Sequence, residues 1–312
     1  MKPYLPDWAD EATRSRAGLL ELEGFIACHF GLRLRVGGGF ETAVLPSAKF
    51  KRPGGRDTDD LTDARRFATT AAGLIARATA VPWVGDTMSA IEVRSAALRT
   101  SRHRWVDFEA LVEASWEMGV PVVYLPDIPG KPRKPEGMVT FAQGRPVVVL
   151  MKNQPIADWM SFILAHELGH IGRGHLGTDE GAAVVDVSTF ETEADVEEDV
   201  QESEANGFAQ AVLGDPLNLK NWPPAAQLAT DAIHFGSKEC ISPGYAVLNA
   251  VRHTTTHGKN LWPLVHATLK TINERLGNKP TADICRDAMQ RHVDMNAVKP
   301  DTLDFLEKLK VL

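Results

Sequence analysis

Two histidines four residues apart, His166 and His170, constrain this 312-residue chain more than any other feature. They begin and end the pentapeptide HELGH at residues 166–170. Side chains four apart share one face of a helix, so the two imidazoles are placed to bind a single zinc ion. The preceding residues 154–165 are mainly apolar, with Pro155 placed as a first helical residue and Asp158 in the first turn. The spacing therefore predicts a helix that begins at about Pro155 and carries a Zn²⁺ site.

Glu167 lies between the two histidines in the sequence. In a zinc hydrolase built on this motif, the glutamate polarises the metal-bound water as a general base. We therefore predict that Glu167 is catalytic and does not bind the metal.

A catalytic zinc ion usually takes three protein ligands, so a third must lie downstream. His175 is the nearest candidate, but the metzincin pattern would need glycine at 173 and histidine at 176, where the chain has Arg173 and Leu176. Glycines at 172, 174 and 177 are typical of a helix end. We expect His175 to be a partly exposed residue just past the helix, outside the metal site.

The acidic candidates are better placed. Residues 202–213 repeat apolar side chains at helical spacing, which predicts a second amphipathic helix. Glu202 and Asn206 share a face of it, so Glu202 is predicted to bind zinc while Asn206 supports a ligand by hydrogen bonding. Glu204 and Glu191 are the alternative ligands.

At these motifs the chain resembles the ImmA/IrrE-type zinc metallopeptidases, through HELGH and the segment ExEANxFA that begins at Glu202. The resemblance implies a minimal zincin-like fold with His166, His170 and Glu202 as ligands and Glu167 as base. It implies a regulatory metallopeptidase that makes limited cuts in a partner protein such as a DNA-binding transcriptional repressor, in stress response or transcription regulation. The alternative is a non-enzymatic zinc-containing sensor or regulatory scaffold of the same fold.

Composition bounds the remaining possibilities. No run approaches the length of a membrane span and the N-terminus lacks an apolar signal core, so we expect a cytoplasmic protein without membrane contact. A net charge of −7 makes direct nucleic-acid binding an unfavoured function. Three widely spaced cysteines (Cys28, Cys240, Cys285) predict reduced, buried thiols.

The predicted fold class is α+β, with a small sheet packed on the HELGH helix. Residues 1–115 are predicted to be mainly helical, 116–220 to form the catalytic core and 221–312 to be helical again. Strands are predicted at 120–125, 138–142 and 145–151, the last two as a hairpin around Gln143 and Gly144. An edge of this sheet beside the active helix is a candidate site for a substrate bound as an added strand.

Two charged segments are interpreted from their composition. Residues 179–204 carry eleven Asp or Glu and no Lys or Arg, a composition typical of a mobile, solvated segment. The alternatives are that this segment covers the cleft or attracts a basic segment of the substrate. A basic cluster (Lys49, Lys51, Arg52, Arg56) is predicted to lie in a solvated loop.

A hydrolase also requires a donor that stabilises the oxyanion, and the candidates for it are Tyr245, His234 and His253.

Overall fold

The computed structural model describes residues 2–46, 48–51, 61–85, 88–130, 132–186, 200–215, 217, 219, 221–252 and 260–312. It is a mixed α+β structure rich in helix, as the sequence predicted. The N-terminal half contains η1 (Lys2–Tyr4), α1 (Ala9–Ala12), α2 (Arg16–Phe30), α3 (Thr62–Arg77), α4 (Ala90–Thr100) and α5 (Phe108–Glu117). The remaining helices are α6 (Ala157–Gly172), α7 (Val200–Leu213), α8 (Ala225–Glu239), α9 (Pro243–Arg252), α10 (Trp262–Leu276), α11 (Thr281–His292), η3 (Met295–Ala297) and α12 (Pro300–Lys308).

The main sheet has the strand order β3-β7-β5-β6-β4. Its strands are β3 (Ala48–Lys51), β4 (Val122–Tyr124), β5 (Gly137–Ala142), β6 (Arg145–Leu150) and β7 (Ala183–Asp186). β5 runs antiparallel to both neighbours, β6 and β7, whereas β3 is parallel to β7 and β4 is parallel to β6. A separate hairpin of β1 (Leu32–Leu34) and β2 (Phe40–Thr42) follows α2.

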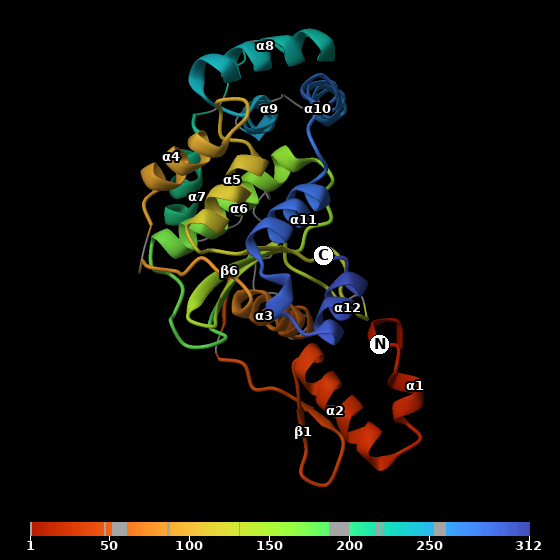
Figure 1. Cartoon of the computed structure of the whole chain (residues 1–312). Helices are drawn as coiled ribbons and strands as arrows, with labels where there is room; N and C mark the ends of the chain where they lie inside the picture. Colours follow the sequence, from red (N-terminus) through yellow and green to blue (C-terminus); the bar gives the residue numbers. More distant parts are fainter. Residues whose placement is uncertain are drawn as a thin grey trace.

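The β5–β6 hairpin forms where β-branched residues flank a two-residue turn. Gln143 and Gly144 both have positive φ, of 53° and 77°, which is the conformation of a type I′ hairpin turn. The strands are buried along almost their whole length, because α6 contacts β5 and β6 while α3 contacts β4, β5 and β6. Figure 1 shows the sheet between these two helices. A strand covered on both faces loses the alternation of apolar and polar residues.

Strands β3 and β7 correct two expectations. Lys49 and Lys51 were predicted in a solvated loop, but their backbones pair with β7 in a parallel register; Arg52 and Arg56 lie outside the described residues. β7 falls inside the acidic segment predicted to be mobile, where residues 183–186 are all buried. The apolar Ala-Val-Val run explains β7, because burial between two strands outweighs the average charge of the segment.

A continuous core joins the two ends of the chain. It includes Phe25 and Phe30 of α2 together with Phe305 of α12, and Figure 1 shows the N- and C-termini close to each other. The indole of Trp8 donates to Asp301 at 3.1 Å, which fixes α1 against α12. Helices α8, α9 and α10 enclose a smaller cluster around Leu228, Val247 and Leu269.

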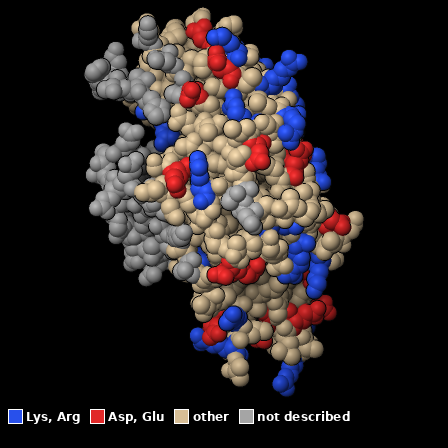
Figure 2. Space-filling model, turned by 90° about the vertical axis from the view of Figure 1, so that its left-hand side faces the viewer, with Lys and Arg blue, Asp and Glu red and all other residues tan. Residues whose placement is uncertain are grey.

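The surface and the cysteines complete the description. Figure 2 shows Lys and Arg interspersed with Asp and Glu over the described part of one face. Among the described residues, no helix combines the length and apolar character needed to cross a membrane.

The three cysteines are free; Cys285 is buried, whereas Cys240 is half-buried and Cys28 is exposed. The expectation of buried thiols was therefore wrong for Cys28, which lies on the outer face of α2.

Candidate metal centre

Helix α6 carries both motif histidines in its last two turns, and their side chains are buried. The helix begins at Ala157, two residues later than the sequence predicted. Ile156 has extended backbone angles and donates its N–H to the side chain of Gln154, while the carbonyl of Pro155 accepts from Thr281 on α11. These contacts hold the chain extended through Pro155, so the proline precedes the helix and does not begin it.

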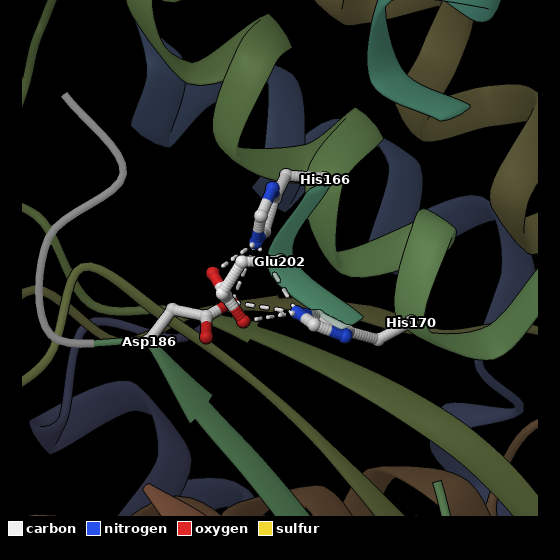
Figure 3. A group of neighbouring side chains, drawn as sticks. All are labelled: His166, His170, Asp186 and Glu202. Atoms are coloured by element: carbon white, nitrogen blue, oxygen red, sulfur yellow. Dashed lines mark hydrogen bonds and ion pairs between the residues drawn. The ribbon is translucent and has the colours of Figure 1, made fainter. Parts of the chain in front are cut away.

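Four side chains from three elements converge at one point (Figure 3). His166 and His170 come from α6, Asp186 ends β7 and Glu202 lies in the first turn of α7. The Nε2 atoms of the histidines are 3.2 Å apart. Oδ2 of Asp186 lies 3.1 Å and 3.2 Å from these nitrogens, and the carboxylate of Glu202 lies 3.4 Å and 3.5 Å from them.

These distances fit a tetrahedral zinc ion. Nitrogen and oxygen ligands at about 2.0–2.2 Å from zinc are separated from one another by about 3.3–3.6 Å in a regular tetrahedron, close to the 3.1–3.5 Å found between these atoms. Apart from the imidazole nitrogens, no described donor reaches either oxygen of Asp186 or Oε1 of Glu202. Buried carboxylate oxygens without donors are costly unless a cation neutralises them. The donor set therefore fits Zn²⁺, and the residues present are able to hold it.

The second ring nitrogen of each histidine has a partner that fixes its orientation. Nδ1 of His166 donates to Oδ1 of Asn206 at 3.0 Å. Nδ1 of His170 lies 2.8 Å from Nδ1 of His175, and Nε2 of His175 lies 2.9 Å from Glu204. With a proton on Nδ1 of His170 and on Nε2 of His175, His170 donates to His175 and His175 donates to Glu204. The Nε2 atoms of His166 and His170 then keep their lone pairs free to face the cluster.

His175 is therefore placed differently from its prediction. It is only 4% exposed and holds His170 in position, although it is not itself among the clustered ligands. The tight turn after α6, with Gly174 at φ 69°, folds His175 back beneath the helix. A pattern search for direct ligands misses such a residue, because its role depends on a histidine and not on the metal.

Glu167 is buried beside the four ligands. Neither of its oxygens has a hydrogen-bond donor among the described residues, and Gly137 of β5 lies so close that an added Cβ would sit 2.1 Å from Oε1. Burial, followed by the negative charge of Asp186, raises the pKa of Glu167 well above its usual value. Glu167 is thus an unpartnered carboxyl group next to the metal ligands, which is the position a general base requires.

The other charges of the cluster show how strongly it favours a cation. Burial opposes protonation of His166, but the charge of Asp186, with hydrogen bonds to Asp186 and Glu202, outweighs it and raises the pKa of His166 well above its usual value. Burial alone would raise the pKa of Asp186, yet the imidazoles of His166 and His170 hold it well below its usual range. The site therefore concentrates negative charge around one point.

Asp186 is the residue that sequence reasoning missed. It was counted with the solvated acids of the segment 179–204, and it has no helical spacing to the motif. The available signal was its place directly after an apolar Ala-Val-Val run, which predicts a buried strand with an acid at its end.

The other candidates lie apart from the cluster or outside the described residues. Glu204 contacts His175 and not the two histidines of the cluster. Glu191 and His253 lie outside the described residues. The hydroxyl of Tyr245 is buried and accepts from Asn249 on its own helix, while His234 is exposed on α8.

In comparisons with known proteins, no protein-family model, no curated protein and no solved structure matches the chain.

Proposed function

We propose that this chain is a zinc-dependent metallopeptidase that makes limited cuts in a partner protein, with a DNA-binding transcriptional repressor as the substrate class. The observation that carries the proposal is Glu167, a fully buried carboxyl group without a donor, next to two histidines and a glutamate that fit zinc. A site that only holds a metal has no need of this additional acid, whose burial is costly.

The roles of the residues follow from their positions. His166, His170 and Glu202 would hold Zn²⁺, with Asn206 and His175 orienting the imidazoles. When bound, zinc supplies a Lewis acid for the scissile carbonyl and lowers the pKa of a water molecule to about 7. Glu167 would take the proton from the attacking water on a carboxylate oxygen and deliver it to the leaving nitrogen.

The resemblance to the ImmA/IrrE-type metallopeptidases supports the regulatory part of the proposal. It rests on HELGH and on the segment from Glu202 to Ala209, and both segments lie on the helices that form the site. Family members of this type act on regulators of gene expression, which favours one specific cut over general digestion. The free cysteines fit the reducing cytoplasm as its location.

Asp186 favours one competing function, a zinc-containing sensor or scaffold without activity. Four protein ligands are typical of structural zinc sites, whereas catalytic sites keep one position for water. Asp186 lies as close to both histidines as a fourth ligand would. The two functions therefore differ in whether Asp186 stays at the metal throughout or leaves it.

The test begins with native mass spectrometry to measure zinc per chain. The zinc-loaded protein is then incubated with candidate repressors encoded near its own gene, and the fragments are sequenced. We expect one zinc per chain and a single cut, made by the wild type or by Asp186→Ala, which an added Glu167→Gln slows by at least about 100-fold while zinc content stays normal. Broad digestion of casein, or repressors left intact under every condition including Asp186→Ala, would contradict the proposal.

A further inference from the structure

Strand β5 lies beside the candidate metal centre, so an edge of this strand that was free would be the natural place for a peptide substrate. Its first residue, Gly137, contacts Glu167. One edge of β5 pairs with β6 in the hairpin. Many proteins bind an extended peptide along a free strand edge through main-chain hydrogen bonds. The other edge of β5 is therefore where the backbone of a substrate would pass the catalytic base.

That edge is already filled by β7. The register pairs Gly137 with Asp186 and Thr140 with Ala183, in antiparallel orientation. The pairing continues at both ends: the N–H of Glu136 donates to the carbonyl of Asp186 at 3.1 Å, and that of Phe141 donates to Ala182 at 2.9 Å. A substrate strand and β7 cannot occupy this edge together.

The same strand brings a carboxylate to the metal position. The side chain of Asp186 is 1% exposed, while that of Glu202 is 26% exposed. Figure 3 shows Asp186 reaching the two histidines from the end of β7, whereas Glu202 reaches them from α7. Since a tetrahedral ion has four positions, two histidines and two carboxylates leave none for water.

The N-terminal part of the chain holds β7 in place. β3 pairs in parallel with all four residues of β7, from Ala183 to Asp186. The buried guanidinium of Arg65 on α3 donates to the carbonyl of Gly181 at 3.1 Å and also to that of Pro46, just before β3. Arg65 thus fastens the start of β7 to the segment that leads into β3.

We propose that β7 is an internal pseudo-substrate and that the folded chain is a latent form, in which β7 occupies the substrate edge of β5 and Asp186 occupies the fourth metal position. Activity then requires Asp186 to leave the metal and β7 to leave β5. The consequence for peptide cleavage rests on the proposed function, but the blocked metal position is testable without any substrate.

The experiment uses the full-length protein loaded with Co²⁺, whose visible absorption reports ligand changes at the metal. Acetohydroxamate, a small bidentate metal ligand, is titrated into the wild type, Asp186→Ala and the isosteric Asp186→Asn. Asp179→Ala, an exposed acid of the same segment, is the matched control. We expect the wild type and the control to bind acetohydroxamate at least tenfold more weakly than both Asp186 variants. Equal affinity in all four proteins would overturn the latent form, and so would loss of Co²⁺ from both Asp186 variants, because Asp186 would then be an obligatory ligand.

A cleavage assay with the same four proteins separates this inference from the proposed function. If the Asp186 variants bind acetohydroxamate tightly but cut no repressor, the result supports a metal position blocked by Asp186 and contradicts the proposed peptidase function. If the wild type cuts a repressor and binds acetohydroxamate as tightly as Asp186→Ala, the result supports the proposed peptidase function and contradicts the latent form. Failure of the wild type to bind Co²⁺ would overturn both.

Discussion

At the scale of single residues, the candidate metal centre is defined by which atoms face each other. Glu202 and Glu204 lie two residues apart on α7, yet only Glu202 contacts the two histidine Nε2 atoms. Glu204 contacts His175, which in turn holds His170. Neighbouring acids on one helix therefore have separate tasks, because a step of two residues turns a side chain to a different face.

This difference predicts graded losses of zinc affinity. Glu204→Ala leaves the candidate ligands in place but removes the carboxylate that His175 contacts, so we expect a loss of about 10–100-fold, as is usual for an outer partner of a metal ligand. Glu202→Ala removes a ligand and should lose more than that. Competition with a chelating dye measures both values. Equal losses in the two variants would show that the ligand has been assigned to the wrong glutamate.

A second residue-scale prediction concerns the space beside the base. In Gly137→Ala the new Cβ would lie 2.1 Å from Oε1 of Glu167 and 3.0 Å from Ile163, so the carboxylate must move. In the Asp186→Ala background, we expect turnover to fall by at least about 10-fold with zinc content unchanged, because geometry at a proton-transfer site is critical. Gly207→Ala on α7 is the control, since no atom lies within 4 Å of its added Cβ. Normal turnover in Gly137→Ala would place the base elsewhere.

At the scale of elements, a buried acid joins the start of α6 to the start of α9. Asp158 accepts from Ser242 at 2.6 Å, its other oxygen has no donor among the described residues, and Gly244 packs against the carboxyl group. Burial raises the pKa of Asp158 to about 6. The folded state therefore binds this proton more tightly than the unfolded chain, where the pKa is 3.8. The free energy of unfolding contributed by Asp158 is highest below pH 3.8 and falls as the pH rises toward 6.

Removal of this acid should change how stability depends on pH. Above pH 6 the cost of ionising Asp158 reaches about 3 kcal/mol, so Asp158→Asn should be more stable than the wild type by up to that amount at pH 8, and by little at pH 4. Urea unfolding at both pH values measures the difference, with the exposed Asp231→Asn on α8 as control. Wild-type and Asp158→Asn stabilities that differ equally at both pH values would refute the assignment.

At the scale of the whole molecule, the candidate metal centre brings together the two described ends of the acidic segment, β7 and the start of α7. It joins α6, β7 and α7, and β7 in turn pairs with β3 from the N-terminal part of the chain. Without a cation, three carboxyl groups (Glu167, Asp186 and Glu202) face one another around two imidazoles. Metal binding should therefore stabilise the fold as a unit.

Metal removal tests this link. At free Zn²⁺ of 100 times its dissociation constant, binding adds about 2.7 kcal/mol to the free energy of unfolding. For a chain of this size that corresponds to a rise in Tm of roughly 5 °C over the chelated protein. Differential scanning fluorimetry measures the shift, and His170→Ala should show none. An identical Tm with and without zinc in the wild type would contradict a metal ion at this site.

The sequence by itself determined the parts of the site that depend on local geometry. His166, Glu167 and His170 lie on one helix, and Glu202 and Asn206 lie on another with the spacing that their roles need. The helical period fixes which side chains share a face, whatever the rest of the fold does. The β5–β6 hairpin was predictable for the same reason, because its turn and strands are neighbours in the sequence.

Only the tertiary structure decided the roles of Asp186, His175 and β3. Asp186 is twenty residues from His166, and its place depends on strand pairing between segments far apart in the chain. The acidic composition of the segment gave the wrong prediction for Asp186. An isolated carboxylate is more stable in water, but it can be buried where a cation or imidazoles neutralise its charge. The apolar run before Asp186 indicates a buried strand, but which strands it pairs with and which side chains its last residue meets are properties of the folded chain.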